Sequence, residues 1–271
     1  MINRLAALKR QIKQNRPLIH CITNPISIND CANAVLALGA RPIMAEHPKE
    51  VCAITKTAQA LAVNLGNITD ARMESILLAG ETAAAQHIPH IIDAVGVTCS
   101  PLRMELARDY IRECKPWIIK GNSSEIKALA GRTVHAPGID AADGDKVTPR
   151  NLAAWADLAK NYALETGAVI LVTGKIDLIC TAEKAYAVQN GCAMLSELTG
   201  TGCMLNVITA SFLAGKDALA AAVFGAAVLG IAGELAQTPK GTGTFRQNLL
   251  DGLYTMTEDA LREKMNIGAV Q

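Results

Sequence analysis

The stretch ALAVNLGNITDARMESILLAGETAAAQHIPHIIDAVG, residues 60–96, decides the fold. It contains an apolar run at 60–66, a helical pattern at 70–86 and a second apolar run at 90–96. Strands that are apolar almost throughout, and not only at every second residue, are typical of a parallel sheet with both faces covered. Residues 60–96 are therefore predicted to form a strand, a helix and a second, parallel strand.

The same alternation extends over most of the chain. Further strands are predicted at 17–23, 41–45, 116–122 and 168–174, and further helices at 29–38, from Pro48, and at 101–113, 123–130 and 151–166. A hairpin is predicted over 177–190, and helices over 203–214, 218–236 and 245–264. No proline-rich or serine-rich linker and no internal repeat interrupts the pattern. We expect an α/β fold in one domain, residues 1–271, with a mainly parallel central sheet and helices on both faces.

Composition excludes several classes of partner. The 271 residues carry a formal net charge of +1 without a basic block. The protein therefore lacks the concentrated positive face with which proteins bind nucleic acid or anionic membranes. An uncharged run at 218–233 is shorter than the roughly 20 residues that span a bilayer, and we expect a buried helix there. The N-terminus lacks the apolar core of a signal peptide. The eight cysteines form no C-x-x-C pair and no zinc pattern, which is typical of a reduced, cytoplasmic protein.

Polar or glycine residues follow the apolar run of five predicted strands. They are Thr23 and Asn24, the residues 64–67, Asp93, the residues 120–122 with Glu125 just beyond them, and Thr173 with Gly174. Ligands of parallel sheets bind beyond the carboxyl ends of the strands. These residues are therefore expected to share one polar crevice with two carboxylates and an amine.

A second candidate feature is the turn SELTGTGCML, residues 196–205. The chain has neither G-x-x-x-x-G-K-[ST] nor, after its first strand, G-x-G-x-x-G, so a P-loop is excluded and a dinucleotide fold is disfavoured. The N–H groups of residues 200–203 can converge on an anion, helped by the positive end of the following helix. The alternative is an ordinary helix start with a flexible turn. Cys203 at this junction can be a nucleophile, a base, a metal ligand or a small residue that fits.

Asp93 and Glu125 are the candidate metal ligands. Both can hold Mg²⁺, mostly through water, beside the phosphates of a nucleotide. The alternative for Glu125 is a capping box with Asn122, and this role is compatible with the first. The alternative for Asp93 is a turn residue at the end of its strand.

Eight stretches together resemble the hydroxyethylthiazole kinases, thiamine-salvage enzymes of the ribokinase-like group. They are PLIHCITN (17–24), ANAVLALGARPIMAEHPKEV (32–51), ALAVNLGNI (60–68), GNSSEI (121–126), GIDA (138–141), TGKIDLI (173–179), NGCAMLSELTGTGCML (190–205) and KGTGTFRQNLLD (240–251). Their order is that of the family, and the combination of LALGARPIMA with LTGTGC is highly specific. The resemblance covers nearly the whole chain and implies a ribokinase-like fold.

The resemblance implies an enzyme that uses ATP and Mg²⁺ to phosphorylate the primary alcohol of 4-methyl-5-(2-hydroxyethyl)thiazole. The roles that it implies are thiazole contacts for Asn24 and Met44, a place beside the hydroxyethyl arm for Gly200, nucleotide phosphate contacts for Lys120 and Thr173, and Mg²⁺ binding for Asp93 and Glu125. Gly202 and Cys203 belong to the catalytic turn, and Cys203 stands where sugar kinases of the wider group have an aspartate base. The family is a homotrimer with sites between subunits, which implies the same assembly here.

Two positions depart from the family pattern. The magnesium strand reads Asp-Ala-Val-Gly at 93–96 in place of Asp-Pro-Val-Gly, and Lys120 replaces the common arginine. We expect a looser turn after Asp93 and, because lysine lacks the bidentate fork of arginine, weaker orientation of phosphate. The alternative functions are a related kinase or ATP-dependent dehydratase with another small substrate, and a non-catalytic regulator that binds thiazole or nucleotide.

Overall fold

A nine-stranded sheet forms the centre of the computed structural model, which describes residues 2–133 and 145–270. Its order is β2-β1-β3-β4-β5-β6-β7-β8-β9. The strands are β1 (Leu18–Ile22), β2 (Arg41–Ile43), β3 (Ala60–Asn64), β4 (His90–Asp93), β5 (Ile118–Asn122), β6 (Val169–Thr173), β7 (Asp177–Cys180), β8 (Ala185–Val188) and β9 (Ile267–Val270). Strands β1 to β6 are parallel, and β7 to β9 are antiparallel to their neighbours. The expected fold class is confirmed.

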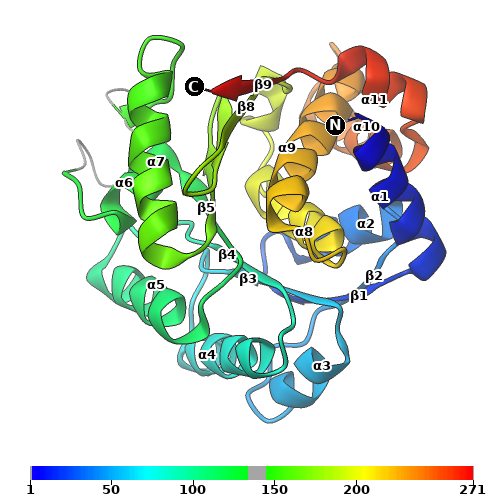
Figure 1. Ribbon diagram of the computed structural model, residues 1–271. Coiled ribbons are helices and arrows are strands. Elements are labelled where there is room, and N and C mark those ends of the chain that lie inside the picture. The colour runs from blue at the N-terminus through cyan, green and yellow to red at the C-terminus, as the bar shows by residue number, and fades with distance from the viewer. Residues whose placement is uncertain (1, 134–144, 271) are drawn as a thin grey trace.

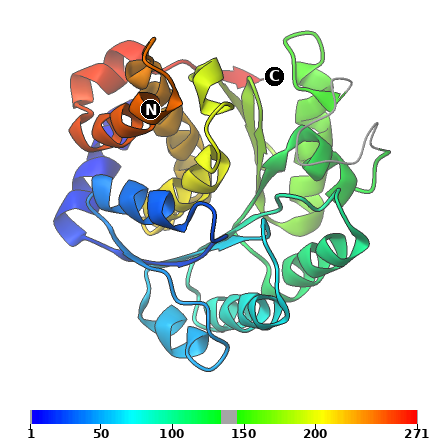
Figure 2. The same ribbon diagram turned by 180° about the vertical axis from the view of Figure 1, so that it is seen from behind.

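Helices cover both faces of this sheet (Figures 1 and 2). They are α1 (Ile2–Asn15), α2 (Ile28–Ala37), α3 (Val51–Thr57), α4 (Asp70–Ala85), α5 (Pro101–Cys114), α6 (Ser123–Leu129), α7 (Leu152–Thr166), α8 (Thr201–Leu213), α9 (Ala218–Ala236), α10 (Thr242–Thr255) and α11 (Glu258–Lys264), with a short 3-10 helix η2 (Ala193–Leu195). One core joins α1, α2 and α8 to α11 to one face, and a second core joins α3 to α7 to the other. Strands buried on both faces explain why their sequences are apolar throughout.

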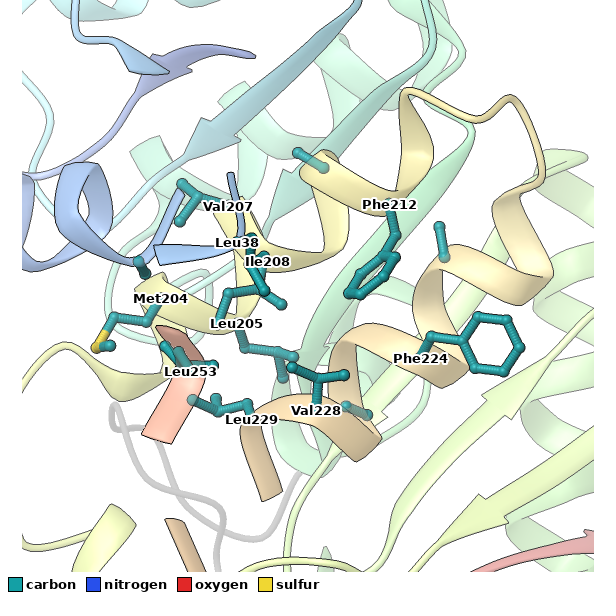
Figure 3. Close-up of a cluster of buried hydrophobic side chains, with 14 of the residues drawn as sticks. Leu38, Met204, Leu205, Val207, Ile208, Phe212, Phe224, Val228, Leu229 and Leu253 are labelled. Atoms are coloured by element: carbon teal, nitrogen blue, oxygen red, sulfur yellow. The ribbon is translucent and has the colours of Figure 1, made fainter. Parts of the chain in front are cut away.

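Helices α8 and α9 form the centre of the first core, as Figure 3 shows. The rings of Phe212 on α8 and Phe224 on α9 meet edge to face with centroids 6.5 Å apart. Helix α8 also packs on β3 and β4, where Asn206 Nδ2 donates a hydrogen bond to Val63 O (3.0 Å). This packing fixes the first turn of α8 relative to the ends of the parallel strands.

Helix α9 is long and apolar enough to cross a membrane by length and composition alone. In this structure 78% of its most apolar window is buried inside the protein. That burial is what a core helix requires, because its apolar sides face the sheet, α8 and α10. The buried helix expected at 218–233 is confirmed.

The C-terminal third differs from the expectation in two respects. The single helix predicted at 245–264 is two helices, α10 and α11, and the side chain of Thr257 caps the second by accepting from Ala260 N (3.1 Å). Strand β9, which was not predicted, pairs with β8. The GIDA motif at 138–141 and most of the loop at 136–148 lie outside the described residues.

Candidate active site

The polar residues at the strand ends lie side by side because the parallel strands are in register. Asn64 of β3 is level with Asp93 of β4, and Asp93 is level with Lys120 of β5. Asn24 follows β1, which pairs with β3. Cys203 reaches the same edge from the first turn of α8. Side chains from four strands and one helix therefore meet where the sequence predicted a shared site.

Hydrogen bonds join five residues in a row, which consists of Asn24, Cys203, Asn64, Asp93 and Lys120. Asn24 Nδ2 donates to Cys203 Sγ (3.1 Å) and to Asn64 Oδ1 (3.2 Å). Asn64 Nδ2 donates to Asp93 Oδ2 (2.9 Å) and to Cys203 Sγ (3.4 Å). Lys120 Nζ donates to the same oxygen of Asp93 (2.8 Å). All five side chains are buried, so these bonds fix how each group is oriented.

The ion pair between Lys120 and Asp93 is almost completely shielded from solvent. Burial lowers the pKa of Lys120, but the charge of Asp93 and its hydrogen bond more than offset this, and the pKa lies above its usual value. Asp93 Oδ1 is buried and has no hydrogen-bond partner among the described residues. An open acceptor on a buried carboxylate is costly, and a cation or a donor on a bound ligand would satisfy it.

Glu125 joins two segments that border the row. Its Oε2 accepts from Asn122 N (2.7 Å) and the Asn122 side chain accepts from Glu125 N (2.9 Å), so the expected capping box is present. Its Oε1 accepts from Gly96 N (2.8 Å). Burial and, second, the charge of Asp93 raise the pKa of Glu125 to about 7. A carboxyl group in this setting is ready to lose its proton when a cation arrives.

The turn after Asp93 is held by the backbone. Ala94 N donates to Lys120 O (2.8 Å), a bond that proline cannot make, and Glu125 binds the amide of Gly96, whose φ is +81°. These two bonds hold the turn. The looser turn expected after Asp93 stays a prediction.

The glycine turn at the start of α8 has a backbone that few residues could adopt. Gly200 has φ +93°, and a Cβ there would lie 2.9 Å from the Cβ of Ser27. With no side chain at Gly200 to cap them, the N–H groups of the first turn are open to an anion. A Cβ on Gly202 would lie 3.7 Å from Lys120 Nζ, so the ammonium group lies beside this turn. The sequence left an anion site and an ordinary helix start equally open, and the nearby amine favours the anion site.

Cys203 is a buried thiol whose surroundings disfavour ionisation. Burial and, second, the charge of Asp93 raise its pKa, and hydrogen bonds from Ser27 and Asn24 and the charge of Lys120 oppose the rise. The thiol is therefore protonated near neutral pH. Among the described residues no group of three or more His, Cys, Asp or Glu side chains could hold a metal ion. Of the four roles open from the sequence, metal ligand and pre-ionised nucleophile are the least compatible with this setting.

Met44 and Thr173, two further predicted site residues, flank the row. Met44 follows β2 and is partly buried, and the neighbouring carbonyl of Ala45 is bound by the buried ring of His20 (Nε2 to O, 2.9 Å). Thr173 ends β6, level with Asn122 at the end of β5. Both therefore lie at the correct edge of the sheet, one on each side of the row.

Three residues near the site were given no role from the sequence. Asn64 was noted only as a strand-end residue. The hydroxyl of Ser27 donates to Asn24 Oδ1 (3.2 Å). Asp177 Oδ1 accepts from Gly174 N (2.9 Å), and burial raises the pKa of Asp177 to about 7 although its side chain keeps some exposed surface. The spacing of Asn24 from Ser27 and of Gly174 from Asp177 is the signal of a turn bond, which could have identified both.

Comparison with known proteins identifies the family. The model of the hydroxyethylthiazole kinase family matches residues 9–259. The chain belongs to this family. It is 48% identical to hydroxyethylthiazole kinase 2 of Clostridium botulinum (strain Hall), over 97% of this chain and 99% of that protein. It is 38% identical to the hydroxyethylthiazole kinase of Ruminiclostridium cellulolyticum, over 98% and 97% of the two chains.

Solved structures agree with this family assignment. The hydroxyethylthiazole kinase protein of Pyrococcus horikoshii is similar with a TM-score of 0.89 at 30% identity, covering 99% of this chain and 100% of that one. The pyridoxal kinase of Staphylococcus aureus is similar with a TM-score of 0.65 at 15% identity, which shows the fold alone. Family membership confirms the expected ribokinase-like fold and the expected enzyme class, a hydroxyethylthiazole kinase.

Proposed function

We propose that this chain transfers the terminal phosphoryl group of ATP to the primary alcohol of 4-methyl-5-(2-hydroxyethyl)thiazole, as part of thiamine salvage. Membership of the hydroxyethylthiazole kinase family supports the substrate. The observation that supports the mechanism most directly is the row from Asn24 to Lys120, which ends beside the open amides of the glycine turn. A hydroxyl group held by one end of this row would face a phosphate held by the other.

The substrate lies, in this proposal, between Asn24, Met44 and Gly200. The apolar side chain of Met44 suits a thiazole ring, and Gly200 lets the turn pass close to Ser27 and Asn24, beside which we place the hydroxyethyl arm. Thr173 and Lys120 contact the phosphates of ATP from the next strands. The amides of Gly202 and Cys203, at the positive end of α8, stabilise charge on the transferring group.

Magnesium suits the carboxylates on the other side of the row. Asp93 has an open, buried oxygen, and Glu125 borders it with a pKa of about 7. Mg²⁺ usually keeps several waters and takes only one or two carboxylates with substrate phosphates, so a larger cluster of acidic residues is not required. When bound, the ion neutralises charge on the phosphates. Lys120 donates a hydrogen bond to Asp93 and so holds this carboxylate in place.

Cys203 has a minor role in this mechanism. Phosphoryl transfer through a loose transition state depends on position and charge more than on removal of the hydroxyl proton. A protonated, buried thiol is a weak base, and two asparagine amides already donate to its sulfur. We therefore assign most of the rate to the amide turn, Lys120 and the Mg²⁺ site.

The proposal is tested by measuring ADP release with Mg·ATP across several alcohols. The thiazole alcohol, a pyrimidine alcohol, pyridoxal and a sugar are compared at equal concentration. We expect kcat/KM for the thiazole alcohol to exceed the others by at least about 100-fold, because a pocket built for one ring leaves polar groups unpaired with another. Preference for another alcohol would identify a related kinase, and calorimetric binding without ADP formation would identify a non-catalytic regulator. Either result contradicts the proposal.

The assembly and location are also proposals. We propose one domain over residues 1–271, a homotrimer with sites between neighbouring subunits, and a cytoplasmic protein. The exposed side chain of Ile26, 74% accessible and two residues after Asn24, supports an interface beside the site. The kinship with metabolic kinases supports the cytoplasm.

A further inference from the structure

Asn64 lies at the centre of the row and has the only side chain that contacts three of the other members. Its Nδ2 donates to Asp93 Oδ2 (2.9 Å) and Cys203 Sγ (3.4 Å), and its Oδ1 accepts from Asn24 Nδ2 (3.2 Å). Gly66 N donates to the same Oδ1 (2.8 Å). The side chain is fully buried. Each hydrogen and each lone pair of its amide is therefore used.

The orientation of this amide follows from its neighbours. If nitrogen and oxygen were exchanged, the carbonyl oxygen would face the Asp93 carboxylate and the NH₂ group would face two other donors, Gly66 N and Asn24 Nδ2. The observed orientation is the one that pairs donors with acceptors throughout. Asn64 thus presents one N–H to the carboxylate and the other to the thiol.

We propose that Asn64 is a positioning residue that fixes Asp93 and Cys203 relative to each other, and so aligns the phosphate side of the site with the alcohol side. This inference rests on the proposed function. Of Asp93 and Cys203, Lys120 bonds to the first alone and Asn24 to the second alone. Asn64 is the one side chain of the row that bonds to both. Errors of about 1 Å in such alignment can lower a rate about 100-fold.

The discriminating variant is Asn64→Asp. It has nearly the same shape and keeps the two hydrogen bonds accepted from Gly66 and Asn24, but loses both donated bonds and places a second carboxylate beside Asp93. Asn64→Ala, which removes all four bonds without adding charge, is the second variant and serves if the first does not fold. The matched control is Asn190→Ala, because Asn190 is a buried asparagine whose amide donates to Glu234 Oε1 (3.0 Å) and Lys264 O (2.7 Å) and to none of the row.

The first readout compares kcat with the affinity for the thiazole alcohol. We expect kcat to fall about 10- to 100-fold in both Asn64 variants. The Kd of the alcohol, measured by calorimetry without nucleotide or metal, should change less than about threefold, because Asn24 keeps its bonds to Ser27 and Cys203. Asn190→Ala should keep kcat within about threefold even if its melting temperature falls. Unchanged kcat in a folded Asn64 variant, or a rise in Kd as large as the fall in kcat, would overturn the inference.

The second readout does not depend on activity. Thermal unfolding is measured for metal-free Asn64→Ala, Cys203→Ala and the double variant. The changes in the free energy of unfolding caused by the two single variants should not add up to that of the double variant, because each single variant breaks the same bond. The changes in the free energy of unfolding caused by Asn190→Ala and Cys203→Ala should add, because Asn190 bonds to Glu234 and Lys264 and not to Cys203. Additive changes for Asn64→Ala and Cys203→Ala in the double-mutant cycle would show that the bond between these residues carries no coupling energy, and would overturn the inference. A wild-type chain inactive on the thiazole alcohol would instead contradict the proposed function and leave this cycle to decide the role of Asn64.

Discussion

At the scale of single residues, the site consists of small polar groups with defined partners. The sulfur of Cys203 receives two amide hydrogens, and the Asp93 oxygen beside it receives an amide and an ammonium. Such an environment is built to hold negative charge, although burial opposes its formation on the thiol. It should therefore accept a carboxylate at position 203.

We predict that Cys203→Asp remains an active kinase. The amides of Asn24 and Asn64 can donate to the new carboxylate as they do to sulfur, and Lys120 offsets its repulsion from Asp93. The measurement is kcat with Mg·ATP and the thiazole alcohol, which should lie within about tenfold of wild type or above it. Cys31→Asp, at a neighbouring buried cysteine without two amide donors, should fail to fold. A folded but inactive Cys203→Asp protein would contradict the prediction.

A second prediction concerns pH and Asp177. Burial raises its pKa to about 7, so the folded state binds a proton more tightly than the unfolded state. The free energy of unfolding that depends on this group is largest below about pH 4 and falls as pH rises towards 7. In Asp177→Asn this dependence should vanish, so the stability of the variant relative to wild type rises between pH 4 and 7. Urea unfolding at several pH values measures the free energy of unfolding of both proteins. If this free energy changed with pH in the same way in the variant and in wild type, the prediction would be contradicted.

Sequence reasoning found four of the five members of the row. Asn24, Asp93 and Lys120 are polar residues directly after apolar strands, Cys203 lies in the glycine turn, and the family resemblance implied the role of each. Asn64 occupies an equivalent strand end, but an asparagine there is also a common turn residue. Only the register between β3 and β4 shows that it lies between Asp93 and Cys203.

At the scale of elements, the position of the site depends on how closely α8 and α9 pack. A Cβ on Gly225 of α9 would lie 2.3 Å from Thr209 Oγ1 of α8, and a Cβ on Gly230 would lie 2.6 Å from Asn190 O. Glycine lets α9 approach α8 at the first place and the segment that follows β8 at the second. The sequence predicted α9 from its apolar run, but not this close contact, because small residues alone do not reveal which neighbour they face.

We predict that Gly225→Val lowers the free energy of unfolding by about 1–3 kcal/mol or more, because α9 must move away from α8. Because α8 carries Cys203, kcat should fall as well. Gly243→Ala on α10 is the control, since a Cβ there has no heavy atom within 4 Å and alanine favours helix. Denaturant unfolding compares the two, and equal stability of both variants would contradict the prediction.

The breaks between elements were the least predictable feature. The pattern at 245–264 reads as one amphipathic helix, and only the cap at Thr257 divides it into α10 and α11. Strand β9 is a short edge strand whose pairing with β8 comes from far along the chain. Short segments of this kind depend on tertiary pairing more than on their own composition.

At the scale of the whole molecule, the parallel sheet was predictable because its strands are apolar on both faces. The parallel order β1-β3-β4-β5-β6 then brings five strand ends to one edge of the sheet. The assembly of subunits does not follow from these features. The proposed interface includes the exposed Ile26, which the sequence pattern does not distinguish from other exposed apolar positions.

We predict that the protein is a trimer in solution. Sedimentation equilibrium should give the mass of three chains, and Ile26→Asp should lower both the fraction of trimer and the affinity for the thiazole alcohol. Leu164→Asp, at an equally exposed leucine on α7, is the control and should change neither. A monomer with full activity would contradict the assignment of the site to a subunit interface.

The mechanism proposed for this kinase assigns most of the rate to the amide turn, Lys120 and the Mg²⁺ site, and little to the thiol. Steady-state kinetics of Cys203→Ala with saturating Mg·ATP and thiazole alcohol test this most directly. We predict a fall in kcat of less than roughly a thousandfold, within the range of general acid–base assistance, with the Kd for ATP unchanged. A larger fall in a folded protein would contradict it, because the thiol would then supply more than the turn and the charges around it.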